Sequence, residues 1–132
     1  MSKPIILCVD DEPFVLESLE IELKRAFGEN YDYEFAESAE EALEVIQDLS
    51  EDNVEVLVII SDWLMPGMKG DELLIRIHQK MPTVIKIMLT GQADEEAVER
   101  AQSEAHLQHC LRKPWDSQEL IETIKTSLAN HE

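Results

Sequence analysis

The amino-acid sequence predicts an α/β fold in which helices cover both faces of a single parallel sheet. Two runs, 5–9 and 56–60, contain five consecutive apolar residues each and are typical of strands buried on both faces. Strand-like and helix-like segments then alternate five times along the chain. Such alternation is typical of a doubly wound sheet, and right-handed crossovers leave few topologies open to it.

The first half of the chain gives the clearer signals for individual elements. We expect the first helix to begin at Pro13, because proline suits the first helical position, and to end at Gly28. Residues 31–35 alternate apolar and polar side chains, which predicts a half-exposed strand near a sheet edge. A capping-box pattern of Ser38 and Glu41 begins the second helix.

The second half repeats the alternation with weaker signals. The helix expected at about 94–104 has a thin apolar face, which predicts one of the more mobile elements of the fold. The other expected elements are a helix around 73–77 that closes before Pro82, a strand at 84–89 interrupted only by Lys86, a short strand at 107–111 and a helix capped by Asp116.

Length and composition limit the classes of protein to consider. The 132 residues fit one domain, 1–132, and the net charge of −18 disfavours direct binding to nucleic acid or to an anionic membrane. No apolar run approaches the roughly 18 residues that a transmembrane helix needs. Cys8 and Cys110 lie in apolar segments and are interpreted as buried, reduced thiols of a cytoplasmic protein.

Polar residues follow four of the five expected strands. They are Asp10 and Asp11, Asp62, Thr90, and Lys113. Because the carboxyl ends of parallel strands lie along one edge of the sheet, we expect these side chains to meet there. Each has an alternative role as a helix cap, a turn former or a solvated lysine. Four strand ends that carry this set together favour a site.

The chemistry of this set is that of phosphoryl transfer. Three carboxylates repel one another, and Mg²⁺, which prefers oxygen ligands, would relieve that repulsion. A carboxylate can act as a nucleophile and form an aspartyl phosphate. An ammonium group such as that of Lys113 can neutralise phosphoryl charge, and a hydroxyl such as that of Thr90 can donate a hydrogen bond to a phosphoryl oxygen.

Four motifs in this order and spacing resemble the receiver domain of two-component response regulators over essentially the whole chain. The resemblance implies a flavodoxin-like (βα)5 fold with the strand order 2-1-3-4-5. The motifs are Val9-Asp10-Asp11-Glu12-Pro13, the segment from Ser61-Asp62-Trp63 to Gly70, Leu89-Thr90-Gly91 and Lys113-Pro114-Trp115.

The resemblance also implies a role for each residue of the set. Asp62 would accept a phosphoryl group from a phosphohistidine, Thr90 would be the switch hydroxyl and Lys113 would pair with the phosphate. The implied ligands of Mg²⁺ are Asp11 and Asp62 directly, Asp10 through water, and the backbone carbonyl of Leu64.

The implied partners are a sensor histidine kinase or phosphotransfer protein and a downstream effector. The expected output surface is the face formed by the fourth helix, fifth strand and fifth helix, through which a homodimer is also expected. The domain would act as a switch that dephosphorylates slowly, with no turnover of an external substrate. Receiver domains often carry an aromatic residue where this chain has Cys110, so we do not expect a threonine–aromatic relay here.

Three other functions fit the sequence less well. A haloacid-dehalogenase-type phosphatase needs a second acid two residues after the nucleophile, where this chain has Leu64. A flavin-binding flavodoxin needs a phosphate-binding loop after the first strand, and here that loop is acidic. A degenerate receiver used only for docking would not need the complete set of acids, threonine and lysine.

Overall fold

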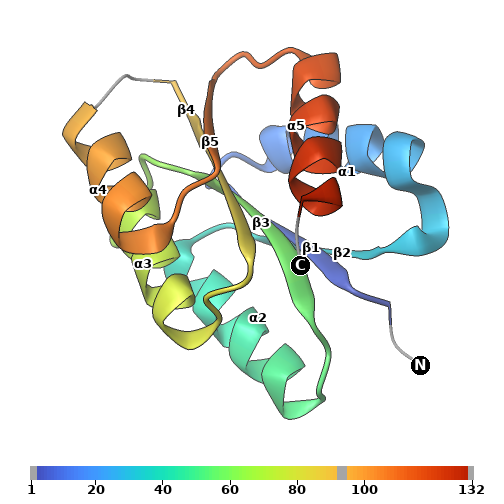
Figure 1. Ribbon diagram of the computed structural model, residues 1–132, viewed down its shortest axis with the longest axis horizontal. Coiled ribbons are helices and arrows are strands. Elements are labelled where there is room, and N and C mark those ends of the chain that lie inside the picture. The colour runs from blue at the N-terminus through green and yellow to red at the C-terminus, as the bar shows by residue number, and fades with distance from the viewer. Residues whose placement is uncertain (1–2, 92–94, 131–132) are drawn as a thin grey trace.

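The computed structural model describes residues 3–91 and 95–130 and confirms the predicted fold. Five parallel strands form one sheet in the order β2-β1-β3-β4-β5 (Figure 1). The strands are β1 Ile5–Val9, β2 Asp32–Ala36, β3 Val56–Asp62, β4 Ile85–Thr90 and β5 His109–Arg112. The helices are α1 Pro13–Phe27, α2 Ala39–Glu51, α3 Gly70–Lys80, α4 Glu95–Ala105 and α5 Ser117–Ala129, and a short 3-10 helix, η1, spans Gly28–Asn30.

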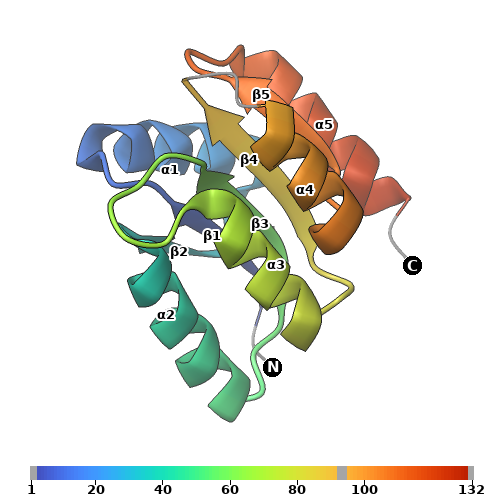
Figure 2. The same ribbon diagram turned by 90° about the vertical axis from the view of Figure 1, so that its left-hand side faces the viewer.

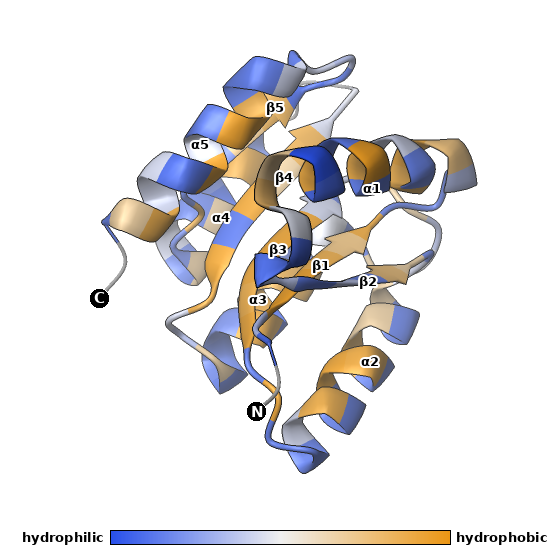
Figure 3. Ribbon diagram, turned by 90° about the vertical axis from the view of Figure 1, so that its right-hand side faces the viewer, coloured by the Kyte–Doolittle hydropathy of each residue, from blue (hydrophilic) through white to orange (hydrophobic). Residues whose placement is uncertain are grey.

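Helices cover both faces of the sheet in two layers. Helices α1 and α5 lie on one face, and α2, α3 and α4 lie on the other (Figures 1 and 2). Each layer has its own apolar core against the sheet. Figure 3 shows that β1 and β3 are mostly hydrophobic, whereas the helices are hydrophobic on one side only. This difference is expected when central strands are covered on both faces and helices on one.

The sequence placed two strands one position too early. Strand β2, expected at 31–35, is Asp32–Ala36, and β4, expected at 84–89, is Ile85–Thr90. A pattern of apolar residues cannot detect a polar residue that ends a strand through backbone pairing. Thr90 is such a residue, since it pairs with Arg112 of β5. The prediction that β2 lies at an edge is confirmed.

The fifth strand was also predicted too early, and for a different reason. Residues 107 and 108 precede the strand, because Leu107 belongs to the end of α4 and the Gln108 N–H donates to the Lys86 carbonyl of β4 at 2.9 Å. His106 has a positive φ of 53°, and the Leu107 N–H donates to the Ala101 carbonyl at 3.2 Å. Both features belong to a helix-ending turn. The predicted start of α4 at residue 94 lies outside the described residues.

The predicted starts of three helices, α1, α2 and α5, are confirmed. At the start of α2, one hydrogen bond of the predicted capping box has a different donor. Pro13 is the first residue of α1, and Asp116 caps α5 with its carboxylate. The Ser38 hydroxyl accepts from the Glu41 N–H at 3.0 Å. The Glu41 carboxylate accepts from the N–H of Glu37, one residue before the position that a capping box uses.

The two cysteines differ in exposure. Cys8 is buried as predicted, but Cys110 is only partly buried, because β5 lies at the edge of the sheet where one side of the strand is open. Within residues 3–91 and 95–130, none of the helices has both the length and the apolar character needed to cross a membrane.

Lys86 is a fully buried lysine in the middle of β4. Its ammonium donates to the Val84 carbonyl at 2.7 Å. Burial lowers the pKa of Lys86 from 10.5 to about 8, because the charged form loses its hydration. The charged amine is therefore more costly in the folded protein than in the unfolded chain at neutral pH.

We predict that Lys86→Met raises the free energy of unfolding at pH 7 by about 1–2 kcal/mol, after allowance for the lost hydrogen bond. Because the folded-state pKa lies below the unfolded one, the cost of the amine is fully present below pH 8. It fades as the pH rises towards 10.5. Urea unfolding at pH 7 and pH 10 measures both effects. A variant less stable than the wild type at pH 7 would contradict the prediction.

Candidate functional site

Three carboxylates gather where β1 and β3 end. Asp10 and Asp11 follow β1, and Asp62 is the last residue of β3. One oxygen from each lies within 4.8 Å of the others. Asp10 and Asp62 are buried and Asp11 is exposed, so the cluster opens to solvent on one side. The sequence prediction that these three side chains meet is confirmed.

Lys113 brings a positive charge to the same cluster. Its Nζ atom lies 2.7 Å from Asp10 Oδ2, 3.2 Å from Asp62 Oδ1 and 3.7 Å from Glu12 Oε1. One ammonium from the end of β5 thus contacts carboxylates at the ends of β1 and β3. Its own side chain is only 16% exposed, so water screens these charges weakly.

Backbone hydrogen bonds between neighbouring strand ends hold the edge together. The Trp63 N–H donates to the Leu89 carbonyl at 3.0 Å, which ties the end of β3 to β4. The Lys113 N–H donates to the Thr90 carbonyl at 2.8 Å, which ties the end of β5 to β4. The side chains of Asp62, Thr90 and Lys113 therefore project from a common frame that spans β3, β4 and β5.

The other two predicted site residues lie at the same edge. Thr90 is the last residue of β4 and is 4% exposed. Leu64 lies in the loop two residues after Asp62, with its residue surface 45% exposed. A leucine side chain has no oxygen, so the backbone carbonyl is the part of Leu64 that can bind a metal.

The charges at this edge shift two pKa values. Burial, followed by the neighbouring charge of Asp10, raises the pKa of Asp62 from 3.8 to about 6, although Lys113 opposes the shift. Burial alone would lower the pKa of Lys113. The hydrogen bond and charge of Asp10, together with Asp62, outweigh that effect and raise it above 10.5.

The donor set fits a hard divalent cation. Both oxygens of Asp10 are engaged, since Oδ1 accepts from the Glu12 N–H at 2.9 Å and Oδ2 accepts from Lys113. The carboxylates of Asp11 and Asp62 are less committed to protein donors, so they suit direct contact with Mg²⁺ better than Asp10 does. The division between direct and water-mediated ligands stays a prediction.

Two supports of the site were missed by sequence reasoning. Gly70 begins α3, and a β-carbon there would overlap the Asp62 carbonyl oxygen, so only glycine lets the loop return against the strand end. The Glu40 carboxylate accepts from the Met68 N–H at 3.4 Å and braces the same loop from α2. Gly70 was visible as a glycine after the predicted loop, but nothing in the sequence showed what it packs against.

Comparison with known proteins gives the class of this chain. A flavodoxin-like sheet with acids and a lysine at its carboxyl edge is the architecture of phosphorylatable signalling switches. The model of the response regulator receiver domain matches residues 6–125, and the chain belongs to that family. It is a signalling switch domain, a class that generally does not turn over a substrate.

Individual relatives support the assignment. The receiver domain of an HD domain-containing protein from Pseudomonas fluorescens Pf-5 is 34% identical, with a TM-score of 0.86 over 98% of this chain and 97% of that one. A CheY-like receiver domain protein from Methanospirillum hungatei JF-1 is 32% identical, with a TM-score of 0.85 over the same shares. The hydrogenase transcriptional regulatory protein HoxA of Cupriavidus necator is 28% identical over 93% of this chain. The match spans only 24% of that regulator's length.

We predict that Asp62→Asn stabilises the metal-free protein by about 1–3 kcal/mol at pH 7.5. The pKa of Asp62 is higher in the folded protein than in the unfolded chain, so its ionisation weakens the fold above about pH 6. The gain should fade as the pH falls from 6 towards 4. Urea unfolding in EDTA measures it, and added Mg²⁺ should reduce the difference by stabilising the wild type. Equal stabilities at pH 7.5 in EDTA would contradict the prediction.

Proposed function

We propose that Asp62 is the phosphoacceptor of this receiver domain and that the donor is a phosphohistidine on a sensor histidine kinase or a phosphotransfer protein. The observation that carries the proposal is the position of Asp62. It is the one carboxylate of the cluster that ends the central strand β3, contacts Lys113 and lies among the other two acids. Membership of the family supports the reaction class.

The proposed step exchanges one bond to phosphorus for another. A carboxylate oxygen of Asp62 attacks the phosphorus, the new O–P bond forms as the P–N bond to imidazole breaks, and the leaving imidazole takes up a proton. Lys113 already contacts Asp62 at 3.2 Å, so its charge is in place to offset the charge that arrives. Thr90, at the end of the adjacent strand, is the proposed donor to a phosphoryl oxygen.

Mg²⁺ is the proposed cofactor, held by Asp11 and Asp62, by Asp10 through water and by the Leu64 carbonyl. When bound, the cation would neutralise charge on the phosphoryl group. The family binds Mg²⁺ at an acidic pocket, and the three carboxylates of this chain form such a pocket. The exposure of Asp11 leaves a side through which the cation and the phosphodonor can enter.

The product would be a switch state that is lost by slow hydrolysis. Phosphorylation transmits a signal only if it favours one conformation of the output surface over another. The proposed output surface is the face of α4, β5 and α5, which would bind an effector or a second copy of this chain as a homodimer. The two free cysteines, Cys8 and Cys110, fit the proposed cytoplasmic location. If this domain is part of a longer protein, we propose that the output is transcriptional, as the name of the curated relative suggests.

We predict that acetyl phosphate with Mg²⁺ adds one phosphoryl group to this protein and none to Asp62→Asn, because the amide is not a nucleophile of this kind. Intact-mass spectrometry counts the adducts. The control is Asp10→Asn, which keeps the nucleophile and should still be modified, though more slowly. An adduct of the same yield on Asp62→Asn would remove Asp62 from the proposal.

We predict that Asp11→Asn weakens Mg²⁺ binding at least about tenfold, whereas Glu12→Gln weakens it less than about threefold. Asp11 belongs to the carboxylate cluster, and Glu12 only borders it through Lys113 at 3.7 Å. Quenching of tryptophan fluorescence during Mg²⁺ titration measures both affinities, since Trp63 adjoins Asp62. Equal losses in the two variants would show that the cation is held by general negative charge and not by Asp11.

A further inference from the structure

The residue after the proposed phosphoacceptor begins a chain of polar contacts that reaches α4. The Trp63 indole Nε1–H donates to Asp71 Oδ1 at 3.2 Å. The other oxygen of Asp71 accepts from Arg100 Nη1 at 3.1 Å. Trp63 and Asp71 are 7% and 8% exposed, so the first of these bonds is shielded from water. One carboxylate of α3 thus joins the end of β3 to α4.

Arg100 is the main polar connection between α4 and α3. Besides Asp71, its guanidinium reaches Glu72 Oε1 at 2.7 Å, and within α4 it lies 3.5 Å from Glu104. The planar guanidinium fixes the direction of these bonds as well as their charge. The contacts therefore define where α4 sits on α3, which is its chief packing partner.

The apolar packing of α4 is thin, which makes those polar contacts more important. Its buried side chains are three alanines, whereas α3 buries four leucine and isoleucine side chains. Small side chains bury little area, so they resist a shift of the helix weakly. Helix α3, in contrast, is anchored in the core by its large apolar side chains. If the two helices shift relative to each other, we expect α4 to be the one that moves.

The position expected to carry an aromatic switch cannot serve here. Cys110 is a small side chain, partly buried in the edge strand β5. It cannot change the output face by a large area when it moves. A signal that starts at Asp62 and reaches α4 needs another physical connection, and the contacts of Trp63, Asp71 and Arg100 supply one.

We propose that Asp71 is a positioning residue that couples Trp63 to Arg100, so that phosphorylation of Asp62 is transmitted to α4 through this carboxylate. The inference rests on the proposed function and adds a route for its output. A displacement of the β3 end moves the indole of Trp63. The Asp71 carboxylate then adjusts to keep its bond, and Arg100 carries the adjustment to α4.

The test uses beryllofluoride with Mg²⁺ as the phosphoryl analogue and two separate readouts. A Trp115→Phe background leaves Trp63 as the one tryptophan, so its emission reports binding at the neighbouring Asp62. Hydrogen exchange across α4, residues 95–105, reports the response. In this background we expect beryllofluoride to change both the emission and the exchange rates.

Two variants remove the coupling while keeping the site. Arg100→Gln removes the guanidinium, and Asp71→Asn keeps an oxygen for the Trp63 indole but loses the charge that holds Arg100. Both should bind beryllofluoride within about threefold of the parent affinity and lose more than half of the exchange response of α4. The double variant should lose no more than either single one, because the two residues act in one chain.

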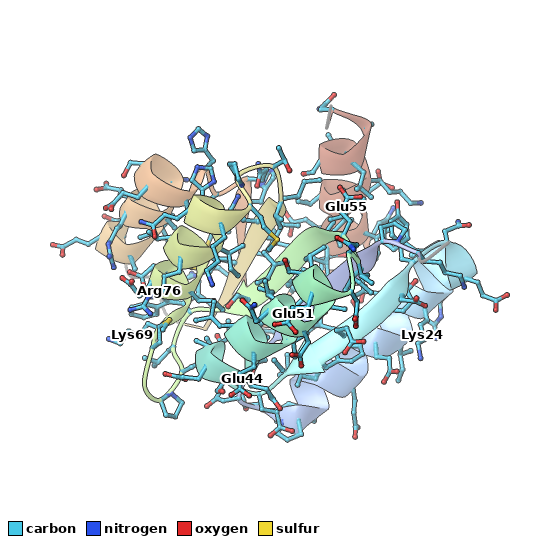
Figure 4. The ribbon with its side chains drawn as sticks, turned by 90° about the horizontal axis from the view of Figure 1, so that it is seen from below. Lys24, Glu44, Glu51, Glu55, Lys69 and Arg76 are labelled. Carbon is cyan, nitrogen blue, oxygen red and sulfur yellow. The ribbon has the colours of Figure 1, made fainter. Side chains whose placement is uncertain are left out.

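The matched control is Arg76→Gln. Arg76, labelled on α3 in Figure 4, pairs with the same Glu72 at 2.9 Å, and this pair lies within α3. Its variant should respond as the parent does. Arg100→Lys should restore part of the response, since an ammonium can reach only one carboxylate at a time.

The outcomes separate the two proposals. If the parent shows no change with beryllofluoride, the proposed function fails. If the parent responds and Arg100→Gln and Asp71→Asn respond equally well, the function stands and the coupling is wrong. If Asp71 and Arg100 only brace α4, both variants should raise the hydrogen exchange of α4 without beryllofluoride and keep the change that beryllofluoride induces. That result would also overturn the inference.

Discussion

The repulsion between three carboxylates at one edge of the sheet is the constraint on which the rest of this site depends. A parallel sheet places the ends of β1 and β3 side by side, so Asp10, Asp11 and Asp62 cannot avoid one another. Lys113 relieves the repulsion from the end of β5, with contacts of 2.7 and 3.2 Å. Burial, followed by the charge of Asp10, still raises the pKa of Asp62, although Lys113 opposes that shift. A site left with excess negative charge is ready for a divalent cation and, through it, for a phosphoryl group.

The two helical layers serve this site in different ways. Helices α2 and α3 brace the loop after β3, since Glu40 holds Met68 and Gly70 packs on the backbone of Asp62. Helix α4 packs through small buried residues and is also joined to α3 by the ion pairs of Arg100. The fold thus combines a braced strand edge with one helix that buries only small side chains, a combination that suits a domain that must change shape when its charge changes.

Negative charge is also distributed unevenly over the surface. No lysine or arginine occurs between Arg25 and Lys69, a stretch that includes β2 and α2. Glu44 and Glu51 project from α2 in Figure 4. Long-range repulsion from this side of the molecule disfavours approach of nucleic acid or anionic membrane, and favours partners whose contacting surface is basic.

Sequence reasoning recovered the sheet, the order of elements and the convergence of Asp10, Asp62 and Lys113, because apolar periodicity and strand-end chemistry are local signals with a simple geometric meaning. It misplaced the ends of strands by one or two residues, because backbone pairing and not side-chain polarity determines where a strand ends. It could not find the bond between Trp63 and Asp71 or the packing of Gly70, because those depend on how a loop folds back in three dimensions.

The contact between Lys113 and Asp10 joins residues 103 positions apart in the chain. Loop closure over such a distance is entropically costly, and parallel strands pair only after their crossovers have formed. The ammonium therefore reaches the carboxylates only once β5 has joined the sheet. During synthesis, a chain that has not yet released β5 from the ribosome carries the acids but lacks their counter-charge. The edge of the sheet therefore gains its charge balance only when the last of the five strands in chain order is in place.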